Sequence, residues 1–182
     1  MGYNRQDILV SAIKSKKLET IRCLMVSGMG VNDMDEKGRT ALMFASNFGH
    51  FEIVKYLIDN GAEVNAVDKE GDSALIYAVE VNKSKIVETL IKNNVNVNNV
   101  DKRGWTALMS ASELGHLGLV KKLVKNGANV GAVDNYNKSA LMHALSEKHS
   151  DIVEYLTRAE GICGKGNNDI KIEGKNERTV RN

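Results

Sequence analysis

The sequence predicts an all-α solenoid of about five stacked helix–turn–helix units with projecting β-turns, and three observations support this prediction. The chain repeats itself with a period of 33 residues, so that four copies open at Asp35, Asp68, Asp101 and Asp134. Every copy places turn-forming residues before two short apolar stretches. The apolar fraction of 42% and the charged fraction of 26% are those of a folded globular chain. Periods of this size are typical of units that bury their apolar faces only by stacking on one another.

The repeat register divides the chain into five units and a tail. The expected repeats cover residues 3–34, 35–67, 68–100, 101–133 and 134–160, and the first of them lacks the opening turn. We expect the second helix of the last copy to end near Glu160. Residues 161–182 contain many Gly and Asn and few large apolar groups, which predicts a disordered polar tail.

Within each copy, a turn leads into a capped helix. The turns "DEKG", "DKEG", "DKRG" and "DNYN" carry Gly or Asn where a positive φ is expected. The predicted helix N-caps are Thr40, Ser73, Thr106, Ser139 and, in the first copy, Asp7. The helix that follows has alanines four residues apart on one face, as at Ala107 and Ala111. These small residues allow a neighbouring helix to approach closely.

A second, more apolar helix completes each copy. Residues that tolerate a left-handed conformation precede it, at Gly49, Asn82 and Gly115. Larger apolar residues such as Ile53, Val54 and Leu57 then form its buried face. Two antiparallel helices and one projecting turn therefore make one layer of the predicted solenoid.

The stretches "DEKGRTALMFA" and "GHFEIVKYLIDNGAEVN" resemble the ankyrin repeat, whose signature includes D-x-x-G-x-T-P-L-H-x-A and G-H-x-E-I-V. The resemblance covers most of the chain and implies the ankyrin fold. One departure recurs, because Ala and then Met or Ile stand where the family has Pro and His. This departure predicts somewhat weaker helix caps and the same fold. The resemblance also implies that His50, His116 and His149 brace the loop between the two helices.

The resemblance further implies a concave face, lined by the turn tips and the inner helices, that binds a partner protein. The candidate binding residues are the positions at this face that vary between copies. They are Arg39, Phe44, Phe48, Asp72, Tyr77, Glu80, Lys102, Arg103, Trp105, Glu113, Leu114, Tyr136, Lys138 and His143.

Trp105 is the strongest candidate for the centre of this face. It is the only tryptophan and stands beside Lys102 and Arg103, and aromatic and Arg residues dominate binding hot spots. The alternative, that Trp105 packs on the neighbouring turn, is equally open. The two cations predict a partner with acidic groups. The valines that close each copy, at Val67, Val100 and Val133, are expected to have a structural role between the turns.

No catalytic, metal or cofactor site is expected from the sequence. The segment "DMDEKG" imitates a calcium loop, but Lys37 and Phe44 stand where oxygen ligands are required. The glycines of "GICGKG" lack the spacing of a phosphate loop. Neither cysteine belongs to a zinc-type spacing; Cys23 is expected in the core, and Cys163 in the tail. A reactive thiol at Cys163 is the enzymatic alternative, although no base is placed beside it.

Charge and hydropathy exclude several classes of partner. The net charge is +2, and residues 161–182 alone carry five Lys/Arg against three Asp/Glu. The rest of the chain is balanced, so we expect neither a nucleic-acid-binding face nor a membrane segment. The sequence therefore predicts a cytoplasmic, monomeric, non-enzymatic module that binds another protein. Two alternatives stay open, namely an exported microbial effector that acts on a host protein and a self-associating structural spacer.

Overall fold

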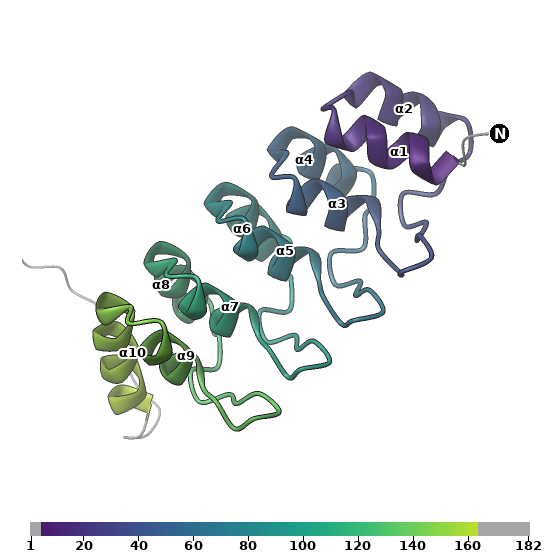
Figure 1. Ribbon diagram of the computed structural model, residues 1–182. Helices are drawn as coiled ribbons and strands as arrows, with labels where there is room; N and C mark the ends of the chain where they lie inside the picture. Colours follow the sequence, from purple (N-terminus) through teal and green to yellow (C-terminus); the bar gives the residue numbers. More distant parts are fainter. Residues whose placement is uncertain (1–4, 164–182) are drawn as a thin grey trace, which may run out of the picture.

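The computed structural model describes residues 5–163, and within this range ten helices form five antiparallel pairs. They are α1 (Arg5–Lys14), α2 (Leu18–Val26), α3 (Ala41–Asn47), α4 (Phe51–Asp59), α5 (Ala74–Glu80), α6 (Ser84–Lys92), α7 (Ala107–Glu113), α8 (Leu117–Lys125), α9 (Ala140–Ser146) and α10 (Ser150–Cys163). Figure 1 shows the odd-numbered inner helices in one row beside the projecting turns, and the even-numbered outer helices in a second row behind them. Among residues 5–163, none of the helices has the length and apolar character that crossing a bilayer requires. The predicted all-α solenoid is confirmed.

The core is a continuous layer that runs through all five pairs. The paired alanines of the inner helices are buried completely or nearly so, as at Ala74 and Ala78. Successive inner helices pack on one another, α3 on α5, α5 on α7 and α7 on α9. The outer helices add their aliphatic face, for example Ile86, Val87 and Leu90 of α6. Each pair therefore buries its apolar surface against its neighbours, as the period predicts.

The predicted hydroxyl caps are present at all four inner helices that follow a turn. The Oγ1 atom of Thr40 accepts a hydrogen bond from the N–H of Met43 at 3.4 Å, and Thr106 does the same with Met109 at 3.2 Å. Each of these two methionines also accepts the N–H of its threonine on the thioether sulfur. Methionine thus offers a weak acceptor at the position where the family has histidine. At Asp7 the prediction is wrong, because α1 begins at Arg5 and Asp7 lies inside its first turn.

Left-handed residues stand where the sequence predicts them. Gly49 and Gly115 have φ of 71° and 74°, and Asn82 has φ of 53°. Gly71, at a turn tip, has φ of 89°, and a Cβ atom there would lie 2.9 Å from the Cα of Asp101 in the next turn. Glycine is therefore needed at this turn both for its backbone angle and for the close approach of the following copy.

A ladder of asparagines joins the loops behind the turns. The side chain of Asn65 donates to the carbonyl of Asn94 at 3.2 Å and accepts the N–H of Asn96 at 2.7 Å. Asn32 and Asn98 make the same two bonds one repeat earlier and one repeat later. One amide side chain per layer thus satisfies a donor and an acceptor of the next layer.

The histidines that precede the outer helices connect neighbouring layers as well. The Nε2 atom of His50 lies 3.3 Å from the carbonyl oxygen of Lys14, and that of His149 lies 2.8 Å from the carbonyl oxygen of Glu113. Both carbonyls belong to the last residue of the inner helix in the preceding repeat, namely α1 for Lys14 and α7 for Glu113. The brace that the resemblance implies therefore reaches across the repeat boundary at these two positions.

Three expectations need correction. Cys23 is exposed rather than in the core, because it lies on the solvent side of α2 while Ile21 takes the buried position. The last helix continues to Cys163 rather than ending near Glu160. Val67, Val100 and Val133 form backbone bridges to the N-cap residues, yet their side chains are exposed. The expected tail beyond residue 163 lies outside the described residues.

A pair of glycine substitutions tests the stacking of the turns. We expect Gly71→Ala to lower the free energy of unfolding by about 1–3 kcal/mol, because it forces a positive φ on alanine. We expect Gly118→Ala to raise it by about 0.5–1 kcal/mol, since alanine is the better helix former. Gly118 lies in α8, and no atom stands within 4 Å of the place that an alanine Cβ would take. Urea unfolding monitored by circular dichroism measures both. A neutral Gly71→Ala would contradict the close approach of successive turns.

Candidate protein-binding face

Each turn closes around the carboxylate of its first residue. One oxygen of this Asp accepts the backbone N–H groups of the residues two and four positions later, at 2.8–2.9 Å in all four turns. Asp68, Asp101 and Asp134 are buried. Local side-chain to backbone bonds of this kind fix a turn without help from the rest of the chain.

The second carboxylate oxygen receives a different partner in each copy. Asp35 pairs with the Arg39 guanidinium at 2.7 Å, and Asp101 pairs with Arg103 at 2.7 Å. Asp134 contacts Nε2 of His143 at 3.0 Å. Asp68 accepts instead the hydroxyl of Tyr77, at 2.7 Å. Four side chains on the concave side are thereby fixed against the turns.

Backbone bonds between the tips hold the turns in one row. The N–H of Lys69 donates to the carbonyl of Lys37 at 2.9 Å, and the N–H of Lys102 donates to that of Glu70 at 2.8 Å. Asn135 repeats the pattern with Arg103 at 2.9 Å. Figure 1 shows the resulting row of projecting turns beside the inner helices. The row and the inner helices together form one extended, stiff surface.

A family model described as "Ankyrin repeats (3 copies)" matches residues 9–101 and again residues 75–169, which together exceed half of the chain. The chain belongs to the ankyrin repeat family. No curated protein matches it significantly. Ankyrin repeats generally mediate protein–protein interactions and are typically non-enzymatic.

The structure divides the candidate binding residues of this ankyrin domain into three groups. Phe44 and His143 are buried, so their side chains support the face rather than present a surface. Arg39, Tyr77, Lys102 and Arg103 are bonded to carboxylates of the turns. The others are half-buried or exposed, namely Phe48, Asp72, Glu80, Trp105, Glu113, Leu114, Tyr136 and Lys138. The last group contains the side chains that are available to a partner.

Of the two alternatives that the sequence left open for Trp105, the structure supports the packing role. Its ring lies 4.4 Å from the ring of His143 in the next inner helix, between centroids, and the Arg103 guanidinium lies 4.7 Å from the Trp105 centroid. The residue is half-buried, so part of the indole remains uncovered. Trp105 therefore packs on the neighbouring repeat and still contributes aromatic area to the face.

Carboxylates outnumber cations at the middle of the concave side. Burial raises the pKa of Asp72, and Asp68 and Asp101 raise it further against the opposing effect of Arg103. Burial also raises the pKa of Glu80, again with Asp72 adding to the effect. One oxygen of Asp72 is buried without a hydrogen-bond partner among the described residues. Because Tyr77 is neutral, the partner of the second Asp68 oxygen brings no positive charge, unlike the arginines that pair with Asp35 and Asp101.

The expected attraction of acidic partners to Lys102 and Arg103 has little support from these contacts. Lys102 pairs with Glu70 at 3.4 Å in the preceding turn, and Arg103 is committed to Asp101. Each of these two cations is thus paired with a carboxylate of the same molecule. The local excess of charge at this face is negative.

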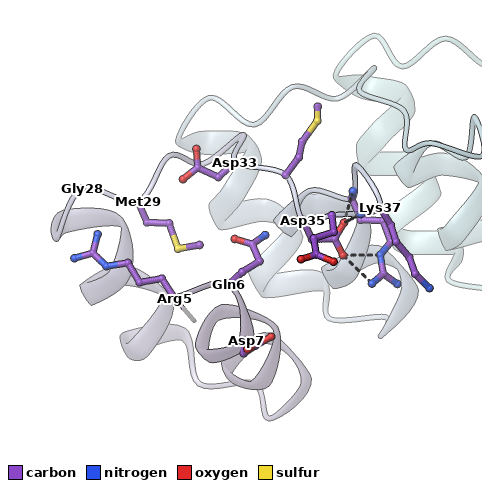
Figure 2. Close-up of a pocket in the computed structure, with 11 residues that line it drawn as sticks. Arg5, Gln6, Asp7, Gly28, Met29, Asp33, Asp35 and Lys37 are labelled. Carbon is purple, nitrogen blue, oxygen red and sulfur yellow. Dashed lines mark hydrogen bonds and ion pairs between the residues drawn. The ribbon is translucent and has the colours of Figure 1, made fainter. Parts of the chain in front are cut away.

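A hollow of about 680 Å³ lies at the N-terminal end of the same side. It is lined by Arg5, Gln6 and Asp7 at the start of α1, by Met29 and Asp33 on the loop after α2, and by Asp35 of the first turn (Figure 2). The first copy has no opening turn. Within the described residues, no earlier turn therefore packs against the first turn in the way that Lys37 of the first turn bonds to Lys69 of the second. The sequence did not point to this hollow, although the missing turn in the first copy was the available signal.

Metal binding finds no support in the described part of the chain. Between residues 5 and 163, the structure contains no group of three His, Cys, Asp or Glu side chains that could hold a metal ion. The calcium-like segment at residues 33–38 instead contributes Asp35 to the first turn, where its carboxylate binds backbone N–H groups and Arg39.

Two substitutions of the same kind should have opposite effects on stability. Burial would raise the pKa of Asp134, but the N–H groups of Lys138 and Tyr136 and the His143 ring outweigh it, so its pKa is lowered. Asp134→Asn should therefore destabilise the domain by about 1–3 kcal/mol at neutral pH. This difference from the parent should be lost as the pH falls from the ordinary Asp value of 3.8 through the lowered pKa of the folded state.

Asp72→Asn should stabilise the domain at neutral pH, because the raised pKa shows that the folded state disfavours the charged form. This gain should shrink as the pH falls through the raised pKa of Asp72, where the parent carboxylate takes up a proton. Thermal unfolding followed across the acid range compares the two variants. Equal signs for the two substitutions at neutral pH would refute the assignment of these electrostatic environments.

Proposed function

We propose that the chain is a non-enzymatic adaptor that binds a partner protein through its concave face and turn tips. The observation that carries the proposal is the set of side chains left free after the turns and the core are satisfied. Leu114 is 43% exposed at the end of α7, and Tyr136 is 78% exposed at the tip of the last turn. Together with the uncovered part of Trp105, they offer apolar and aromatic area on a stiff frame.

The proposed partner presents at least one basic side chain to the middle of this face. Asp72 lies near Asp68 and Asp101, and Glu80 lies near Asp72 and Asp101; burial and these carboxylates raise the pKa values of Asp72 and Glu80 against the opposing effect of Arg103. A cation from a partner would relieve this repulsion. Acidic partners would meet repulsion at the same place.

The proposed compartment is the cytoplasm. The side chain of Cys23 is an exposed free thiol, which suits a reducing compartment. That chemistry supports the cytoplasm of the producing cell and, equally, the cytoplasm of a host that an exported effector would enter. Affinity capture from each source, followed by mass spectrometry, separates these two forms of the proposal.

Trp105→Ala tests the location of the binding face. We expect this substitution to weaken binding to a captured partner by about 2 kcal/mol or more, which is roughly thirtyfold in the dissociation constant. Lys125→Ala is the control, since Lys125 is exposed on outer helix α8. Isothermal titration calorimetry gives both affinities. Circular dichroism must show that the Trp105 variant is folded, because Trp105 also packs on His143. If both folded variants bind with equal affinity, the concave face is not the site.

A double variant that removes two negative charges from the face tests the chemistry of the partner. We expect Asp72→Asn combined with Glu80→Gln to weaken binding at low salt and to reduce its dependence on ionic strength. The fold should not suffer, because both side chains carry raised pKa values in the parent. Stronger binding by the double variant would show that the partner brings acidic groups to this region.

A further inference from the structure

The C-terminal end of the described solenoid exposes an apolar helix face that is buried in every internal repeat. Met142 and Leu145 of α9 are 49% and 54% exposed. Their equivalents one repeat earlier are Met109 and Ser112 of α7, and both are buried completely because α9 packs over them. Positions exposed in the last copy alone must face the next layer of a stack. Within residues 5–163, Met142 and Leu145 therefore form a stacking face that no other layer covers.

The N-terminal end exposes the complementary positions. Ile8 of α1 is 38% exposed, whereas its equivalent Ala41 in α3 is 1% exposed because α1 covers it. A hollow of about 410 Å³ lies over the start of α1 and is lined by Asp7, Ile8, Ser11, Ala12, Lys17 and Thr20. Ser11 and Ala12 correspond in register to Ser110 and Ala111 of α7, both of which are buried, and α7 packs on α5. This end thus carries the receiving half of the stacking contact.

We propose that the chain associates head to tail with a second copy of itself, with Met142 and Leu145 of one copy packed into the hollow beside Ile8 of the next. The contact continues the packing of α3 on α5, α5 on α7 and α7 on α9, with α9 of one copy followed by α1 of another. The α9 face is apolar, the N-terminal hollow combines Ile8 and Ala12 with polar residues, and both are in the register that the internal repeats use. The inference is independent of the proposed adaptor function.

The geometry predicts an open assembly. The two faces are different, so each contact is heterologous and leaves one face free at each end of the assembly. We expect weak, reversible growth into linear stacks rather than a closed dimer. Of the possibilities open from the sequence, the end faces favour the self-associating chain over the monomer.

Sedimentation velocity of the full chain tests the proposal between roughly 10 µM and 1 mM, where small interfaces become populated. We expect the weight-average sedimentation coefficient of the parent to rise with concentration. Ile8→Asp and Leu145→Asp should each stop growth, weakening association at least about tenfold. An equimolar mixture of these two variants should form a one-to-one dimer and nothing longer, because the Ile8 variant keeps only its C-terminal face and the Leu145 variant keeps only its N-terminal face.

Controls separate this outcome from misfolding and from other contacts. Val100→Asp places the same charge on an exposed valine of a middle repeat and should associate like the parent. Met142→Asp provides a second disruption of the α9 face if the Leu145 variant unfolds early. A parent that stays monomeric throughout overturns the proposal and assigns the α9 face to another segment or another protein. Association that Leu145→Asp abolishes and Ile8→Asp leaves intact also overturns it, since that pattern indicates a symmetric contact between two α9 helices.

Discussion

The concave side of this protein is organised by a carboxylate at the start of each turn. Two backbone N–H groups donate to one of its oxygens, so this oxygen stabilises the conformation of the turn. In three of the four turns the carboxylate is also buried, at Asp68, Asp101 and Asp134. Removing such a charge from water is costly unless its remaining oxygen finds a donor. Each copy must therefore supply a donor from its own variable positions.

This requirement limits what the variable positions can do for recognition. Arg39, Arg103 and His143 offer a cationic or potentially cationic donor, and Tyr77 offers a neutral one. In a sequence comparison of the copies these residues differ freely and resemble a recognition surface. In the structure these residues all interact with the second oxygen of a turn carboxylate, although the side chain that does so varies between copies. The phenol at position 77 has a further consequence, because Asp68 accepts a hydrogen bond there without an ion pair, whereas Asp35 and Asp101 each pair with an arginine.

The sequence predicted the parts of the fold that are set by local chemistry. The period, the hydroxyl caps at Thr40 and Thr106 and the left-handed residues at Gly49 and Asn82 depend on backbone geometry within a few residues, and each recurs at a fixed position. The donors to the turn carboxylates were missed, because a period fixes the position of a residue but not the atom to which its side chain turns. The exposure of Cys23 was also not predicted. The nine-residue helix α2 belongs to a terminal repeat and buries only Ile21, so the period alone does not tell which of its apolar residues are covered. The resemblance indicates where the candidate face lies. The sign of its charge could be derived only from the structure, which shows the carboxylate that each cation pairs with.

The same residue type has a different meaning at the ends of a solenoid than in its middle. The methionine of the "ALM" motif is part of the core at Met43 and Met109, and part of the surface at Met142, although the local sequence is almost unchanged. What differs is the presence of a following layer, which lies more than twenty residues away in the chain. The positions equivalent to 145 are a buried serine at Ser46 and Ser112 and a buried valine at Val79, and each of them is covered by a following layer. The larger, exposed Leu145 adds apolar area that gains free energy only when something covers it. An apolar inner-helix face that is exposed at the end of the described stack has the character of an interface, and it has the register of the faces that the next inner helix covers in the internal repeats.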